Sequence, residues 1–190
     1  MYGSYKISTP PASEPITLTE AKTHLRVDVS TDDTYITTLI TAARQIVEKY
    51  LNRALINTTY TVLFDRLPTC IKLLYSPVSS VTSISYKDTA GASQTLSSSL
   101  YVVDTHNEPG QITPAYGADY PSTYGQADAV TVTYVAGYGA SASDVPDAIK
   151  QMILILIGDM YDNRTSQVRQ KMTDLMDFYI QQYKVSVLAE

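Results

Sequence analysis

Residues Ala129 to Arg164 read AVTVTYVAGYGASASDVPDAIKQMILILIGDMYDNR, and this stretch decides the fold. From Val130 to Tyr134 apolar residues alternate with threonine, a period of two that predicts a β-strand. Gly137-Tyr138-Gly139 then predicts a tight turn, because glycine tolerates positive φ. From Ile149 to Tyr161 the chain is apolar nearly all round, which predicts a helix covered on more than one face. A β region therefore runs directly into a helix that must be buried.

Toward the N-terminus the pattern is helical. Thr17 and Glu20 have the spacing of a capping box and predict a short helix from about Leu18 to Arg26. A longer amphipathic helix is predicted from about Asp32 to Leu51, since apolar residues recur there at helical spacing behind an acidic N-terminus. The proline-containing residues 1–16 are predicted to form an extended N-terminal arm.

Between these helices and the opening stretch, the period changes to two. Five or six short strands are predicted between residues 58 and 136, separated by turns such as Ala90-Gly91-Ala92 and Asn107 to Gly110. Helices follow over residues 146–183, the last from about Gln167 to Tyr183. This order predicts an α+β fold in which the N- and C-terminal helices pack together around an inserted antiparallel β tract. Residues 17–190 then form a single domain, with helices at 17–52, the β insertion at 58–136 and helices at 146–183.

Charge and composition exclude several classes of function. The 190-residue chain has a net charge of −5. Between Ser76 and Ala148 one base faces seven acids, whereas gripping DNA phosphates requires clustered lysine and arginine. The longest apolar run, Met152 to Ile157, is far shorter than the roughly 20 residues that span a bilayer, so no membrane contact is expected. The single cysteine, Cys70, allows no internal disulfide and no cysteine-based metal site.

No constellation of residues points to catalysis. His24 and His106 have no partners at metal-ligand spacing, so we expect no metal and no cofactor. His106 with Asp104 and Glu108 would suit an acid–base group, but a solvated turn is the favoured interpretation. Gly137 to Gly139 lacks the lysine and hydroxyl residue of a phosphate-binding loop. The sequence therefore predicts a protein without catalytic residues.

Tyrosine usage favours interfaces. The chain has 16 tyrosines, two phenylalanines and no tryptophan, and a ring with a polar tip suits half-buried and contact positions. The aperiodic segment Pro114 to Asp128 is long enough to suggest a functional loop. The last helix carries a stripe of methionine and tyrosine, which predicts either an interface or core packing against the second helix. The candidate interface residues are Tyr116, Tyr120, Pro121, Tyr124, Met172, Met176, Tyr179 and Tyr183.

Five motifs follow one another in a recognisable order. They are Glu14 to Asp28, the Asp32-Asp33 helix ending in Asn52 to Ile56, Pro77 to Asp88, Val130 to Gly139, and Val145 to Arg164. Their order and spacing resemble the head–tail connector proteins of tailed bacteriophages, also called adaptor or head completion proteins. The resemblance spans most of the chain. Tyr120-Pro121 stands where that family often has an aromatic–proline pair.

The resemblance implies a structural role in the virion, at the head–tail interface, after assembly in the host cytoplasm. Such proteins form a ring, commonly of twelve subunits, that docks on the portal protein and offers a surface to a tail, stopper or tail-terminator protein. DNA is expected to pass through the lumen without specific binding, and the family has no catalytic residues to transfer. The alternative is a β-rich virion or surface module that binds glycans through Tyr116, Tyr120 and Tyr124.

Overall fold

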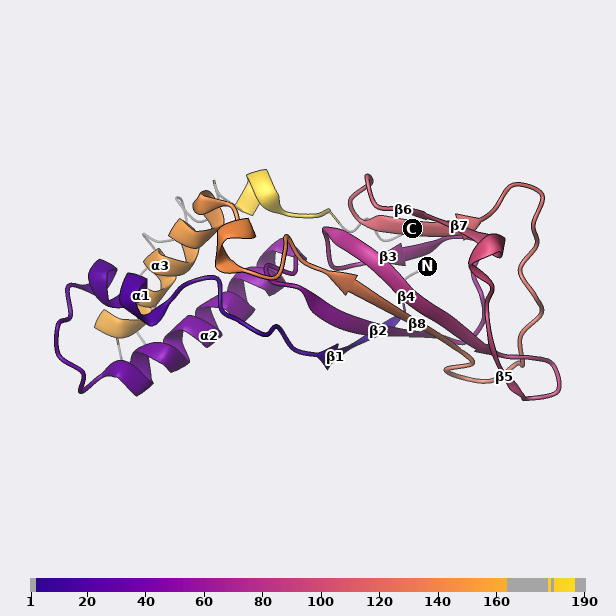
Figure 1. Ribbon diagram of the computed structural model, residues 1–190, viewed down its shortest axis with the longest axis horizontal. Helices are drawn as coiled ribbons and strands as arrows, with labels where there is room; N and C mark the ends of the chain where they lie inside the picture. The colour runs from indigo at the N-terminus through magenta and orange to yellow at the C-terminus, as the bar shows by residue number, and fades with distance from the viewer. Residues whose placement is uncertain (1–2, 164–177, 179, 187–190) are drawn as a thin grey trace.

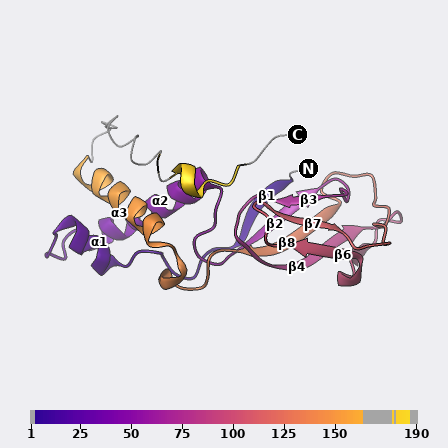
Figure 2. The same cartoon turned by 90° about the horizontal axis from the view of Figure 1, so that it is seen from above.

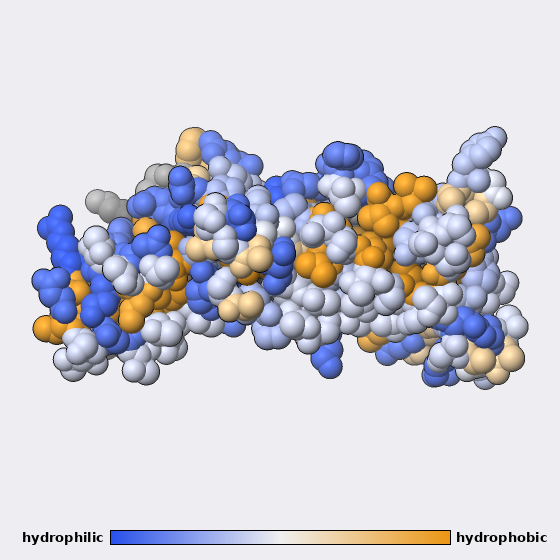
Figure 3. All heavy atoms as spheres, in the orientation of Figure 1, coloured by the Kyte–Doolittle hydropathy of each residue, from blue (hydrophilic) through white to orange (hydrophobic). Residues whose placement is uncertain are grey.

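The structure is a computed structural model that describes residues 3–163, 178 and 180–186. The molecule is elongated, with a helical half at one end and a β half at the other (Figures 1 and 2). The chain crosses between the halves several times, because β1 precedes the first helix and β8 precedes the last described one. Apolar residues reach the surface over both halves on the face seen in Figure 3.

Three helices build the helical half: α1 (Leu18–Leu25), α2 (Asp33–Leu51) and α3 (Asp147–Asp162). The predicted capping box is confirmed, since the Thr17 hydroxyl accepts from the Glu20 amide at 3.2 Å and the Glu20 carboxylate accepts from the Thr17 amide at 2.7 Å. One face of α2 packs against α3, and α1 covers both. The buried core between them comprises Ile16, Ala21, Ile36, Leu39, Ile40, Ala43, Val47, Leu51, Leu55, Ile56, Val145, Ile149, Met152, Ile153, Leu156 and Ile157.

The C-terminal segment returns to the helical core. Residues 180–183 are helical, and Ile180 and Tyr183 pack against the core. The Val185 side chain is buried, and its amide donates to the Leu51 carbonyl at 2.9 Å. Most of the helix predicted from Gln167 to Tyr183 lies outside the described residues.

Two antiparallel sheets build the β half. One has five strands in the order β1-β2-β8-β4-β5, and the other has three in the order β3-β7-β6. Their bounds are β1 (Ser4–Thr9), β2 (Thr58–Phe64), β3 (Ile71–Leu73), β4 (Val78–Lys87), β5 (Ser93–Thr95), β6 (Tyr101–Asp104), β7 (Gly110–Pro114) and β8 (Val130–Ala136). The central strands β2 and β8 alternate strictly between buried and half-buried residues. These strands are therefore the ones that periodicity located best.

The α+β class and the antiparallel insertion are confirmed, but the predicted number of strands was too low. Seven strands, β2 to β8, lie between residues 58 and 136. The strand without a sequence signal is β5, whose three polar residues are all exposed at a sheet edge. Residues 4–9 of the predicted arm form β1, which pairs with β2 at the opposite edge. Edge strands contact the core on few positions, so they lack the apolar alternation that marks inner strands.

Stacked tyrosines join the two sheets. The Tyr60 ring lies 4.5 Å from that of Tyr75 and 5.5 Å from that of Tyr134, both in stacked geometry. Tyr5 meets Tyr75 edge-on, and its hydroxyl donates to the Lys72 carbonyl at 2.8 Å. Part of the abundant tyrosine is thus core, where the ring fills space and the hydroxyl satisfies a backbone group.

The Gly-Tyr-Gly turn closes the junction between the halves. Gly137 has φ of +147°, and its amide donates to the Pro77 carbonyl at 2.9 Å. The next amide, of Tyr138, donates to the Leu55 carbonyl, and the Gly139 carbonyl accepts from Asn57 at 2.8 Å. The positive φ expected for this turn is confirmed at Gly137. The turn therefore joins the end of β8 by hydrogen bonds to residues 55–57, which follow α2, and to Pro77.

Candidate assembly interface

The segment between β7 and β8, residues 115–129, forms a loop at the end of the molecule farthest from α1 (Figure 1). We call it the β7–β8 loop. Hydrogen bonds hold it at both ends and along its course: among them, the Tyr124 amide donates to the Lys87 carbonyl at 2.9 Å, and the Asp128 amide donates to the Asp65 carboxylate at 3.1 Å. The loop contains two acids and no base. The loop is therefore acidic, and hydrogen bonds attach it to the rest of the β half.

Tyr116 is the most exposed large side chain of this loop. The Ala118 amide donates to the Ala115 carbonyl at 2.9 Å, and Gly117 between them has φ of +73°. A glycine with positive φ at the third position is the signature of a type II turn, which places Tyr116 at the second position. The Tyr116 side chain is fully exposed at this turn.

Tyr120 lies differently. Its ring packs against the β core, and its buried hydroxyl has no hydrogen-bond partner among the described residues. Burial raises the pKa of Tyr120 to about 12, because the phenolate would be poorly hydrated there. Pro121 is half-buried beside it, while Tyr124 is exposed. The three tyrosines therefore do not present a common set of open ring faces.

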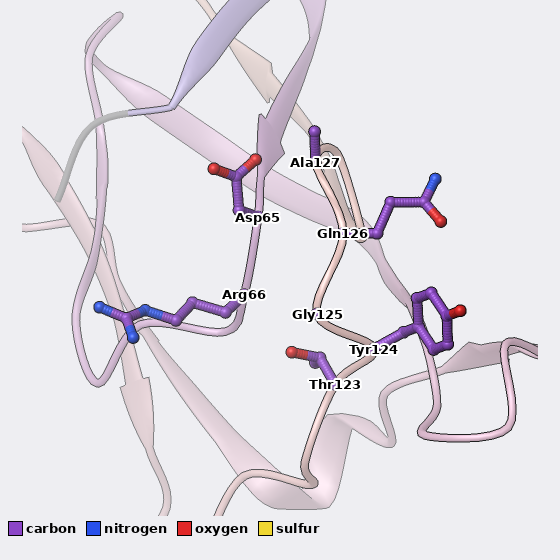
Figure 4. Close-up of a pocket in the computed structure, with 7 residues that line it drawn as sticks. All are labelled: Asp65, Arg66, Thr123, Tyr124, Gly125, Gln126 and Ala127. Carbon is purple, nitrogen blue, oxygen red and sulfur yellow. The ribbon is translucent and has the colours of Figure 1, made fainter.

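A hollow of about 590 Å³ lies between the β7–β8 loop and the turn after β2 (Figure 4). Asp65 and Arg66 stand on one side, and residues 123–127 stand on the other. The Tyr124 and Gln126 side chains point away from Asp65 and Arg66. Since both Asp65 and Arg66 are solvent-exposed, the hollow is an open surface feature rather than an enclosed pocket.

The inward position of Tyr120 predicts an effect of known sign. Replacing Tyr120 with phenylalanine removes a buried, unpaired hydroxyl and is expected to stabilise the fold by about 0.5–1 kcal/mol. The matched change Tyr134→Phe removes a hydroxyl that accepts from the Tyr75 amide at 3.3 Å, and should cost about 1 kcal/mol. Urea unfolding of both variants measures the two changes. Equal destabilisation by the two changes would contradict the placement of the Tyr120 hydroxyl.

A second concave surface lies at the C-terminal end of α2. Its volume is about 450 Å³, and we call it the lysine groove; its lining residues are Ile46, Lys49, Tyr50, Asn52 and Lys184. Tyr50 is exposed although it belongs to an amphipathic helix, and Ile46 is only half-buried. Neither lysine forms an ion pair with a residue that the structure describes. The groove thus combines apolar surface with two ammonium groups that lack carboxylate partners there.

Arg53 connects three parts of the chain just beyond α2. Only 8% of the residue is exposed. Its guanidinium pairs with the Glu108 carboxylate, with Nη1 to Oε1 at 2.7 Å, and its Nε donates to the Tyr183 carbonyl at 2.5 Å. The same group lies 5.8 Å from the centre of the Tyr138 ring. Arg53 therefore ties the β6–β7 turn, the C-terminal segment and the junction turn to one point.

Arg44 fixes the approach to α1 in a similar way. Its Nε lies 2.7 Å from Glu14 Oε2, and its Nη1 lies 2.7 Å from Glu48 Oε2. The other Glu48 oxygen accepts from the Leu55 amide at 3.0 Å. Burial raises the pKa of Glu48, although the neighbouring Arg44 charge opposes that shift. Arg44 and Glu48 stand at the i,i+4 spacing of a helix pair, whereas no local pattern indicated the contact with Glu14, 30 residues away.

The other candidate residues fall in the helix predicted from Gln167 to Tyr183. Met172, Met176 and Tyr179 lie outside the described residues. Tyr183 is half-buried, packs on the helical core and offers its carbonyl to Arg53. Phe178 is exposed. Of the predicted stripe, Tyr183 therefore contacts the core.

Asp104 and Glu108, which were considered with His106 as an acid–base group, have different interaction partners. The Asp104 carboxylate accepts from the His106 amide at 2.9 Å and from the Asn107 amide at 3.2 Å, closing the turn on itself. Glu108 is held by Arg53. Within the described ranges no three His, Cys, Asp or Glu side chains converge as metal ligands. Every helix described is too short or too polar to span a bilayer.

The sequence matches a known protein family, and the fold is similar to those of solved structures. A family model described as head completion protein matches residues 14–173. A chain from the virion of a native gene transfer agent (GTA) particle is 20% identical, with a TM-score of 0.82 and 97% of each chain covered. No curated protein matches in sequence.

Two further solved chains come from GTA necks. One, from the neck of an empty particle computed with C6 symmetry, is 22% identical, with a TM-score of 0.83 and coverage of 98% of this chain and 97% of that one. The other, from the neck of a native particle computed with C12 symmetry, is 21% identical, with a TM-score of 0.72 and coverage of 100% and 98%. At such identities the likeness shows a shared fold.

Proposed function

Because the chain belongs to the head completion protein family, we propose that it is a structural virion protein that joins the portal to the tail. In this proposal several copies form a ring, twelve by analogy with the C12 neck, that docks below the portal protein. The ring extends the channel for DNA and offers its other face to a tail, stopper or tail-terminator protein. The family match over residues 14–173 is the observation that carries the proposal.

The form of the molecule supports this role. It is elongated, with two separate hydrophobic cores held at a fixed junction by Arg53 and the turn at Gly137. A subunit with two separately packed halves offers more than one contact surface to a ring. Exposed aromatic side chains on both halves, Tyr50 and Tyr116 among them, provide the amphipathic contact surface that interfaces favour.

The charge of the β half supports passage of DNA without a grip on it. The fold brings Lys6, Arg66 and Lys72 into the same half as the acidic segment. The excess of acids over bases in this half is therefore smaller than the excess within residues 76–148. It still carries six acids against four bases in residues 3–9 and 58–136. The exposed acids Asp119 and Asp128 lie on the β7–β8 loop, which has no base. Such a surface lacks the clustered cations that release counterions from duplex DNA.

Native mass spectrometry of this chain mixed with the portal protein of the same particle tests the proposal. We expect a complex of one portal ring with a stoichiometric ring of this chain. The same complexes should not retain duplex DNA in a low-salt gel-shift experiment, where phosphate contacts are strongest. A chain that stays unbound at every portal concentration would overturn the proposal.

A further inference from the structure

The two surface features described above are complementary. The β7–β8 loop is acidic and carries the exposed Tyr116. The lysine groove is concave and partly apolar, and it bears Lys49 and Lys184. A projecting tyrosine next to acids matches a hollow with apolar surface and ammonium groups in both shape and charge. Tyr120 of the loop and Ile46 of the groove also pack on the two cores, but the Tyr116 and Tyr50 rings are solvent-exposed.

The two features cannot meet within one subunit. The β7–β8 loop is at the far end of the β half, and the lysine groove lies beside α2 and the C-terminal segment in the helical half (Figures 1 and 2). Intact α2 and a closed junction separate them. A contact between them must therefore involve two copies of the chain.

We infer that the β7–β8 loop of one copy seats in the lysine groove of the next copy, with Tyr116 against Ile46 and Tyr50 and with Asp119 facing Lys49 and Lys184. This inference rests on the proposed ring. The contact joins two different patches, so it is heterologous, and repeated heterologous contacts close into rings. Both lysines also have a local explanation in the helix dipole, since Lys49 lies in the last turn of α2 and Lys184 directly follows the helical residues 180–183.

Site-directed cross-linking tests the contact. In a Cys70→Ser background, chains carrying both Ala118→Cys, two residues from Tyr116, and Lys184→Cys are assembled on the portal and treated with a short bismaleimide. We expect a ladder of multimers on a denaturing gel, because each chain offers both halves of the contact. A mixture of the two single-cysteine chains should stop at dimers. The pair Val102→Cys and Lys184→Cys is the matched control, since Val102 is exposed on β6 outside the loop, and it should give no ladder.

Charge exchange provides a second readout. Lys49→Glu with Lys184→Glu, or Asp119→Lys alone, should each raise the concentration needed for half-assembly by about 5-fold. All three changes together should restore assembly to within about 2-fold of the unmodified chain. Tyr116→Ala should have a larger effect, about 30-fold, if this side chain is an anchor of the contact.

The outcomes separate this inference from the proposed function. Rings seen by native mass spectrometry without a cross-linked ladder would overturn the inference and leave the proposed ring in place. A photoreactive maleimide attached to Lys184→Cys needs no second thiol; its cross-links to the portal, or within one chain to residues 164–177, would assign the lysine groove to those occupants and overturn the inference as well. Failure of the unmodified chain to form any ring on the portal would overturn both.

Discussion

Replacement of Gly137 with alanine is expected to lower the free energy of unfolding by roughly 3–4 kcal/mol. Two separate costs add at this position. The backbone has φ of +147°, a conformation that residues with a side chain rarely adopt. A Cβ atom would also lie 2.5 Å from the Asn57 amide nitrogen and 2.7 Å from the Ile56 carbonyl carbon. These are main-chain atoms that carry the junction between the two halves, so they cannot simply rotate away.

Alanine substitutions at two other glycines separate the cost of the backbone conformation from the cost of the steric clash. Gly91, in the turn between β4 and β5, has φ of +84° but open space where a Cβ would stand, so Gly91→Ala should cost only about 1 kcal/mol. Gly125 has neither a positive φ nor a neighbour within 4 Å, and Gly125→Ala should change stability by less than about 0.5 kcal/mol. Urea unfolding of the three variants gives the comparison. A Gly137→Ala protein as stable as Gly125→Ala would show that the junction is not packed as described.

Local patterns in the sequence were sufficient for much of the fold. The capping box at Thr17, the amphipathic face of α2 and the alternation in β2 and β8 each depend on residues within a few positions of one another. The turn at Gly137 was predictable for the same reason. Such features reflect hydrogen bonds and burial that are decided by neighbours in sequence, so periodicity and turn chemistry report them.

Long-range partners left no comparable signal. Arg53 and Glu108 are 55 residues apart, and nothing around either residue indicates the other. The same holds for the tyrosines of the β7–β8 loop: Tyr120 turns inward and Tyr116 projects, although both are the same residue type in one aperiodic segment. These differences are decided by how the two sheets pack, so composition could indicate an interface-rich protein without locating the interface.

Removing the Arg53 charge is expected to cost about 2–3 kcal/mol and to release the C-terminal segment. In Arg53→Met the aliphatic stem still packs, but the Tyr183 carbonyl and the Glu108 carboxylate lose their partner. The Glu108 side chain is 37% exposed and regains water, so the cost stays below that of a fully buried pair. The Tyr183 carbonyl is tied to the helical half through Arg53, and its release weakens the docking of Val185.

Two measurements separate stability from docking. Urea unfolding gives the change in stability, and the rate of trypsin cleavage after Lys184 reports release of the segment, because proteolysis requires local opening. Arg53→Met should raise that rate severalfold, whereas Glu108→Gln, which keeps the Arg53 bond to Tyr183, should destabilise the fold with little effect on cleavage. Lys22→Met removes the half-exposed pair with Asp33 and is the matched control, with less than about 1 kcal/mol of effect and unchanged cleavage. Equal cleavage in Arg53→Met and Lys22→Met would mean that the segment is held by Val185 and Asn52 alone, since Asn52 Nδ2 also donates to the Val185 carbonyl.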